Sequence, residues 1–179
     1  MLGVSLRRVP GIEAQIPQFA ALFDQIYREH GKTLVFFVMQ ERMDRELSRA
    51  VMDQMEAPAY LASSPMDPAG MLSMLRCMDA MVSMRLHTII FAARERVPTV
   101  GCVYDPKITA FLQMLGLPSC GTPEDLDADA AYETVAELLS HLSAYRETLE
   151  QRVSVLEQTA RRTPQVLAQM LGHGTGTNG

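Results

Sequence analysis

Short apolar segments alternate with longer amphipathic segments along most of this chain, and this alternation is what most constrains its fold. The short segments have the length of buried strands, and the longer ones repeat apolar residues at helical spacing. Strands are predicted over residues 2–6, 33–39, 59–62, 80–84 and 97–104, with a weaker one around 117–120; helices are predicted over residues 12–30, 43–55 and 68–77, from between 84 and 88, and from 105. Such alternation predicts an α/β fold, with a Rossmann-like, doubly wound parallel sheet.

The end of the chain has a different pattern. From Ala131 onward apolar residues recur mostly three to four positions apart, which predicts one long amphipathic helix over about residues 131–163. Pro164 should kink or end it, and residues 172–179 read as a flexible tail. We therefore expect one domain over residues 1–171. Because a predicted strand begins at once without a leader, we also expect the chain to be part of a longer protein.

Composition narrows the class of protein. The 179 residues are 47% hydrophobic and 21% charged, which is typical of a soluble globular domain. A net charge of -5 without a Lys/Arg block argues against nucleic-acid binding. No segment has the roughly 20 apolar residues of a membrane span, and three cysteines without C-x-x-C spacing indicate reduced thiols in a cytoplasmic protein.

Several common cofactor sites lack their sequence signals. No histidine pair has metal-ligand spacing, and no EF-hand or H-E-x-x-H pattern occurs. Neither G-x-G-x-x-G nor a P-loop follows the first two predicted strands, which disfavours nicotinamide enzymes and P-loop NTPases. We expect neither a metal nor a cofactor.

The best candidate site lies where the strand over residues 80–84 gives way to a helix. Arg85 and His87 flank this turn, and the starting helix adds free backbone N–H groups. Such a turn suits a small anionic ligand, which a guanidinium can hold while an imidazole moves a proton. Arg7 follows the first strand, so it should lie along the same edge. Other polar residues follow strands and could complete the rim: Gln40, Asp44, Tyr104 and Asp105.

Each of these residues also has a plain structural interpretation. Arg85 could be a surface ion-pairing group, and His87 could cap the helix. Arg7 could belong to a solvated pair with Arg8, and Asp105 followed by Pro106 is explained as a helix start.

The motifs together resemble a known family. They are V-S-L-R at residues 4–7, D-A-M-V-S-M-R-L-H at 79–87, V-P at 97–98 and Y-D-P-K at 104–107. This combination resembles the polysaccharide pyruvyl transferase family, and within it the CsaB type, which modifies secondary cell-wall polysaccharide. The likeness covers residues 1 to about 167 and corresponds to the carboxyl-terminal half of such enzymes, so their amino-terminal acceptor domain is absent.

The resemblance implies a fold and an activity. It implies one half of a glycosyltransferase-B-like enzyme that transfers pyruvate, as a ketal, from phosphoenolpyruvate to a sugar of a polysaccharide or lipid-linked glycan. It assigns phosphoenolpyruvate contacts to Arg85, Leu86 and His87, and it matches Arg7 to a second upstream arginine. Tyr104, Asp105 and Lys107 match a family motif of unassigned role. In this scheme His87 is the general acid, and the chain alone binds donor without turnover.

Two other functions fit the same sequence. The chain could be the nucleotide-sugar-binding half of another glycosyltransferase-B-like enzyme. It could also be a non-catalytic interaction domain that forms a homo-oligomer through the helix over residues 131–163.

Overall fold

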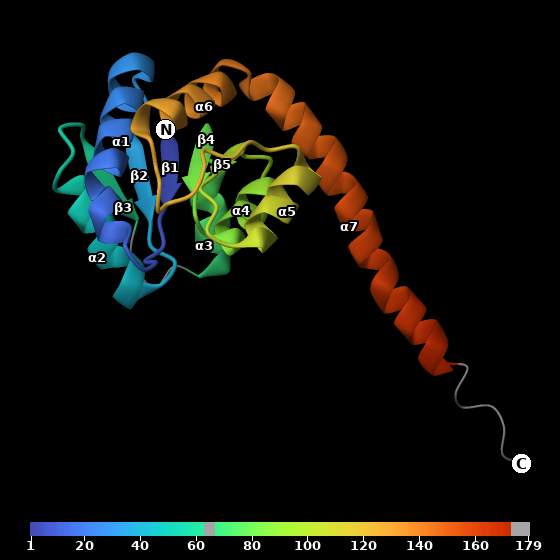
Figure 1. Ribbon diagram of the computed structural model, residues 1–179. Coiled ribbons are helices and arrows are strands. Elements are labelled where there is room, and N and C mark those ends of the chain that lie inside the picture. The colour runs from blue at the N-terminus through green and yellow to red at the C-terminus, as the bar shows by residue number, and fades with distance from the viewer. Residues whose placement is uncertain (63–66, 173–179) are drawn as a thin grey trace, which may run out of the picture.

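Five parallel strands form the central sheet of the described chain, in the order β3-β2-β1-β4-β5. The computed structural model describes residues 1–62 and 67–172. The strands are β1 (Leu2–Ser5), β2 (Leu34–Phe37), β3 (Ala59–Ala62), β4 (Ala80–Ser83) and β5 (Thr99–Gly101). In register, Val4 of β1 lies between Phe36 of β2 and Val82 of β4. The predicted parallel sheet is confirmed, with β1 at its centre (Figure 1).

Helices cover both faces of this sheet (Figure 1). They are the 3-10 turn η1 (Ile12–Gln15) and α1 (Ile16–His30), α2 (Glu41–Met52), α3 (Pro68–Leu75), α4 (Leu86–Arg94), α5 (Pro106–Leu115), α6 (Ala128–Ser140) and α7 (Leu142–Gly172). Helix α1 packs against α2 and α6, whereas α4 packs against α3 and α5. The sheet therefore lies between two helical layers, as expected for a doubly wound, Rossmann-like fold.

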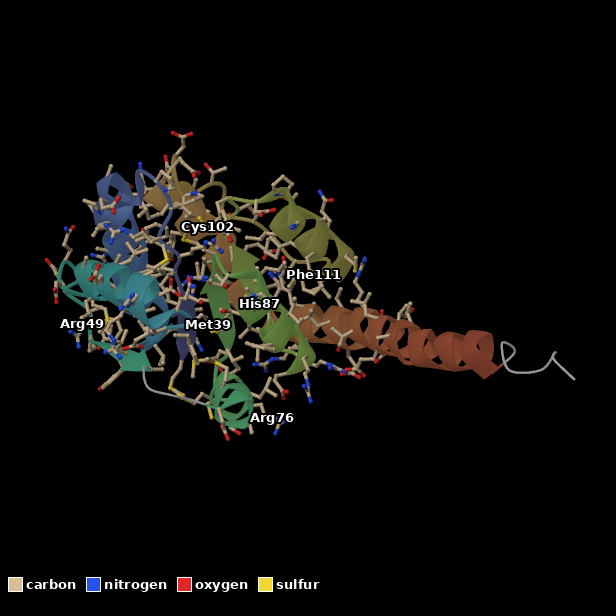
Figure 2. The ribbon with its side chains drawn as sticks, turned by 90° about the horizontal axis from the view of Figure 1, so that it is seen from below. Met39, Arg49, Arg76, His87, Cys102 and Phe111 are labelled. Carbon is tan, nitrogen blue, oxygen red and sulfur yellow. The ribbon has the colours of Figure 1, made fainter. Side chains whose placement is uncertain are left out.

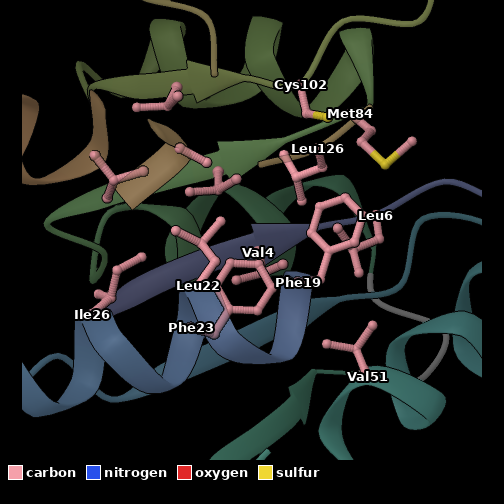
Figure 3. Close-up of a cluster of buried hydrophobic side chains, with 14 of the residues drawn as sticks. Val4, Leu6, Phe19, Leu22, Phe23, Ile26, Val51, Met84, Cys102 and Leu126 are labelled. Carbon is pink, nitrogen blue, oxygen red and sulfur yellow. The ribbon is translucent and has the colours of Figure 1, made fainter. Parts of the chain in front are cut away.

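Alternate strand residues supply the two cores. Val4 and Phe36 face the layer of α1, where Phe36 meets the ring of Phe23 edge-on at a centroid distance of 5.5 Å. Figure 3 shows Val4 and Phe23 in this core. Val35 and Phe37 face the opposite layer. Because both faces of the strands are covered, the strands read as continuous apolar runs in the sequence.

Aspartates begin three of the helices that follow loops. Asp105 Oδ1 accepts a 2.9 Å hydrogen bond from the N–H of Lys107, and Pro106 occupies the first turn of α5. Asp67 and Asp127 cap α3 and α6 in the same manner. The helix start predicted at Asp105 is confirmed, and it fixes the chain at the end of β5.

The carboxyl-terminal helix differs from the prediction. In place of one helix over residues 131–163, α6 ends at Ser140 and α7 begins at Leu142. The ring Nδ1 of His141 lies 3.0 Å from the Glu137 carbonyl, while the N–H of His141 donates to Leu138 instead. The side chain thus takes the carbonyl that a continuing α-helix would use.

Three further details depart from the sequence prediction. Helix α7 continues past Pro164 to Gly172, so the expected end at this proline is wrong (Figure 1). The weak strand predicted over residues 117–120 is reduced to one isolated bridge between Gly101 and Ser119. The tail was predicted from residue 172, but Gly172 ends α7, and residues 173–179 lie outside the described chain.

Within the described ranges, no helix combines the length and apolar character that a membrane crossing requires.

Candidate functional site

The candidate residues gather at the edge where the parallel strands end. Arg7 follows β1, Gln40 follows β2, and Arg85 follows β4. Figure 2 views the molecule from this side, with His87 near the middle of the face. The carboxyl edge of a parallel sheet is where such folds bind ligands, because loops and helix N-termini meet there.

Arg85 joins two of the loops at this edge. Its Nη2 donates a 3.1 Å hydrogen bond to Gln40 Oε1 and forms an ion pair with Asp44 Oδ1. The side chain of Arg85 is only 12% exposed and that of Asp44 is fully buried. Asp44 Oδ2 also accepts a 2.9 Å hydrogen bond from the N–H of Gln40. The loop before α2 and the loop before α4 are therefore tied together through Arg85.

The backbone around Arg85 is held by hydroxyl groups. The N–H of Arg85 donates to Ser83 Oγ at 3.1 Å, and Ser83 Oγ donates in turn to the carbonyl of Arg85 at 3.1 Å. Three residues later, Thr88 Oγ1 lies 3.0 Å from Ser5 Oγ of β1 in a buried pair. These contacts attach the first turn of α4 firmly to the sheet, with its N–H groups at the edge.

Arg7 forms a second group with Tyr104. Its guanidinium carbon lies 4.9 Å from the centroid of the Tyr104 ring, and its backbone N–H points at Met84 Sδ at 3.4 Å. Arg7 thus reaches from the end of β1 past β4 towards the residues that follow β5. The stacked arrangement orients the guanidinium without consuming its hydrogen-bond donors.

Other predicted site residues are placed less closely. His87 and Lys107 are exposed in the first turns of α4 and α5, and within the described chain neither side chain contacts Arg7 or Arg85 by a hydrogen bond. Leu86 is half-buried, and its side chain packs against the core cluster of α4, α5 and α7. The structure therefore assembles Arg85 with Gln40, and Arg7 with Tyr104, at one edge.

An open hollow extends the site beyond Tyr104. It has a volume of about 420 Å³ and is lined by Tyr104, Asp105, Thr109 and Gln113 among others. Within the described residues, no group of three His, Cys, Asp or Glu side chains comes together as metal ligands do. The chemistry that the edge offers is anion binding by two guanidinium groups and a helix N-terminus, beside an exposed imidazole.

The pairing of Asp44 with Arg85 was not foreseen from sequence, although Asp44 was noted as a rim residue. A signal for its burial was present, because Asp44 precedes Leu47, Ser48 and Val51 by three, four and seven positions. Those residues form the buried stripe of α2, and Asp44 lies on the same stripe. A charged residue on an apolar stripe indicates a buried partner.

Comparison with protein families identifies the family of this chain. The family described as polysaccharide pyruvyl transferase matches residues 4–106, which is more than half of the chain. The chain belongs to this family. The matched segment includes Arg7, Gln40, Arg85, His87 and Tyr104, so the edge described above lies within the pyruvyl transferase match. Comparison with curated protein sequences gives no match.

Solved structures agree on the fold. The UDP-GlcNAc 2-epimerase of Neisseria meningitidis, bound to UDP-GlcNAc, is similar with a TM-score of 0.57 and 10% identity, over 83% of this chain and 38% of that one. A putative UDP-N-acetylglucosamine 2-epimerase from Listeria monocytogenes gives a TM-score of 0.60 and 14% identity, over 83% and 39%. A TarM mutant of S. aureus gives a TM-score of 0.52 and 16% identity, over 89% of this chain and 34% of that one. The pyruvyl transferase chain thus has the fold of one part of glycosyltransferase-B-like proteins and spans less than two fifths of their length.

Proposed function

We propose that this chain is the carboxyl-terminal, donor-binding domain, over residues 1–171, of a CsaB-type polysaccharide pyruvyl transferase. The full enzyme would transfer pyruvate, as a ketal, from phosphoenolpyruvate to a sugar of a cell-wall polysaccharide or lipid-linked glycan in the cytoplasm. The observation that carries this proposal is Arg85, anchored at the start of α4 beside Gln40 and Asp44, at the same edge as Arg7.

The charge of phosphoenolpyruvate suits this edge. The donor presents a carboxylate and a phosphate, and each is a partner for the fork of a guanidinium. Arg85 would hold one anionic group and Arg7 the other, while the N–H groups at the start of α4 stabilise the remaining charge. Leu86 would contribute its backbone N–H, since its side chain is turned into the core.

The reaction needs a proton donor beside the bound anion. His87 would protonate the terminal methylene of phosphoenolpyruvate while a sugar hydroxyl attacks the adjacent carbon. The proton of this first hydroxyl returns to His87. Phosphate then leaves, a second hydroxyl of the same sugar takes its place, and the proton of the second hydroxyl passes to phosphate or solvent. The exposed position of His87 in the first turn of α4 supports this role, because the donor and an acceptor could both reach it. The scheme uses no metal and no cofactor.

The missing length limits what the chain can do alone. Because it spans less than two fifths of the glycosyltransferase-B-like structures, acceptor binding would depend on the absent domain. The chain should therefore bind phosphoenolpyruvate without pyruvylating an acceptor. Pyruvylation of an acceptor by the isolated chain would contradict the proposal that this chain binds only the donor.

Calorimetric titration of phosphoenolpyruvate into the purified chain tests the proposal. Arg85→Ala should abolish measurable binding, because it removes the anchored guanidinium. Arg94→Ala is the matched control, since Arg94 is exposed at the far end of the same helix. Equal binding by parent and Arg85→Ala would contradict the proposed site, and preferential binding of UDP would favour the nucleotide-sugar alternative.

A further inference from the structure

A buried carboxylate lies directly beneath the proposed anion site. Asp44 is fully buried, and both of its oxygens are used. Oδ2 accepts the N–H of Gln40 at the start of α2, and Oδ1 pairs with Arg85 Nη2. A negative charge under a site for a dianionic donor is unfavourable by itself, because like charges repel most strongly where water is excluded.

Stability alone does not explain why Asp44 and Arg85 form a buried ion pair. A buried ion pair repays its desolvation only with good geometry, and apolar residues of similar size often serve stability equally well. Ser48, one turn further along α2, is also fully buried, and in the described chain its hydroxyl has no hydrogen-bond partner. This stretch of α2 thus carries polar groups on its buried face at an energetic cost, which points to a purpose other than packing.

The contacts of Arg85 reveal what the carboxylate does. Both hydrogen-bond donors of Nη2 are used, one by the buried Asp44 and one by the exposed side chain of Gln40. Nη1 therefore remains for a ligand. Nε is buried and, within the described residues, has no partner, so a ligand oxygen or a water that reached it would relieve that cost. Asp44 thus determines which part of the guanidinium faces the edge.

We propose that Asp44 is a positioning residue, which holds Arg85 in the orientation that grips the anionic donor. This inference rests on the proposed function for the identity of the donor, but not for the hold of Asp44 on Arg85. Gln40 supplies a second, neutral contact from an exposed side chain. The charge of Asp44 and its complete burial make it the dominant restraint.

The direction in which Asp44→Asn changes the affinity for phosphoenolpyruvate distinguishes a positioning role from a purely electrostatic effect of the charge. Asp44→Asn removes a negative charge near the anion site, so Coulomb's law alone predicts tighter binding of phosphoenolpyruvate. A positioning role predicts the opposite, a loss of affinity of about tenfold or more, because Arg85 is released.

The experiment has a readout that needs no ligand. Proton–nitrogen NMR of the chain should give an Arg85 Nε–H signal, assigned by its loss in Arg85→Lys and protected from solvent exchange. Asp44→Asn should lose that protection while the backbone spectrum stays dispersed. Asp24→Asn is the matched control. Asp24 on α1 accepts the N–H groups of Glu56 and Ala57 from the loop before β3, so this variant should leave Arg85 and donor binding unchanged.

The outcomes are separable. Loss of Arg85 protection together with weaker donor binding supports the inference, whereas an unchanged Arg85 signal, or equal or tighter binding by Asp44→Asn, overturns it. If the parent binds no phosphoenolpyruvate, the proposed function fails, and the Arg85 signal still tests the hold of Asp44. Should Asp44→Asn not fold, Asp44→Glu keeps the charge but shifts it by one methylene, and the same loss of protection is expected.

Discussion

Arg85 and His87 are two residues apart at the start of α4, yet their surroundings differ sharply. Arg85 is packed beneath the edge and paired with Asp44, whereas the side chain of His87 is exposed. Under the proposed function, Arg85 would hold an anionic group of the donor, and His87 would meet both the donor and the acceptor. We therefore expect the two residues to act on different steps.

In the full-length enzyme, His87→Ala should lower turnover by about 10²- to 10⁴-fold, the usual contribution of a general acid. The affinity for phosphoenolpyruvate should change little, because the arginines and the helix N-terminus remain. Steady-state kinetics with a donor titration would separate these effects. His141→Ala, at the exposed junction of α6 and α7, is the control and should retain full turnover. A His87→Ala enzyme with normal turnover would exclude the acid role.

Which site residues could be predicted follows from strand geometry. Arg7, Gln40 and Arg85 each come directly after a predicted strand and Tyr104 ends one, and parallel strands end at one edge. Their pairing could not be predicted, because it depends on how far α2 is rotated about its axis. The apolar stripe of α2 indicates that Asp44 turns inward, but which residue it meets there depends on how α2 lies against the loop before α4.

At the scale of elements, α7 is the helix least enclosed by the domain, and an arginine clamps it. Arg96, which has a positive φ of 59°, pairs with Glu150 at 2.7 Å and with Glu157 at 3.4 Å. The hydrogen bond that Arg96 donates to Glu150 raises the pKa of Arg96, and the same contact lowers the pKa of Glu150. Both partners on α7 are exposed enough for water and salt to screen the pairs.

Glu150→Gln should loosen α7 only modestly, because water and salt screen the pair with Arg96. Amide hydrogen exchange should speed up along α7 and leave β1 unaffected, and added salt should reduce the difference between variant and parent. Glu147→Gln, an exposed change on the same helix, should have no effect. Equal protection of α7 in the Glu150 and Glu147 variants would rule out the clamp.

Helices and strands could be predicted from the sequence where the spacing of apolar residues determines the element. The prediction failed where a single side chain determines where an element ends. The strands and α1 to α5 follow from period and caps. The break at His141 arises because an imidazole competes for the Glu137 carbonyl, which no hydropathy pattern encodes. The strand predicted over residues 117–120 pairs with β5 only through the bridge between Gly101 and Ser119. Pro118 has no N–H with which to continue the hydrogen-bond ladder.

At the scale of the whole molecule, one carboxylate ties together segments far apart in the chain. Asp79, just before β4, accepts hydrogen bonds from Lys32 Nζ at 2.7 Å and from the amino group of Met1 at 2.7 Å. Arg146 of α7 donates to its carbonyl at 3.3 Å. Partial burial would raise the pKa of Asp79, but the hydrogen bonds from Lys32 and Met1 outweigh it and lower the pKa.

A lowered pKa in the folded state has a definite sign. The contribution of Asp79 to stability is complete above the ordinary aspartate pKa of about 3.9 and is lost as the pH falls through the lower folded value. Asp79→Asn should therefore destabilise the chain at neutral pH and flatten the fall in stability below about pH 4. Urea unfolding across this range checks it, with the exposed loop change Asp125→Asn as control. Identical pH profiles for parent and Asp79→Asn would refute this linkage.

The central claim is that the carboxyl edge of this chain binds phosphoenolpyruvate. Backbone NMR shifts during a phosphoenolpyruvate titration test it most directly, because they locate the ligand residue by residue. We expect saturable shifts at Arg7, Arg85, Leu86 and His87, which UDP does not reverse. Shifts confined to other surfaces, no shifts at all, or displacement of phosphoenolpyruvate by UDP would contradict it.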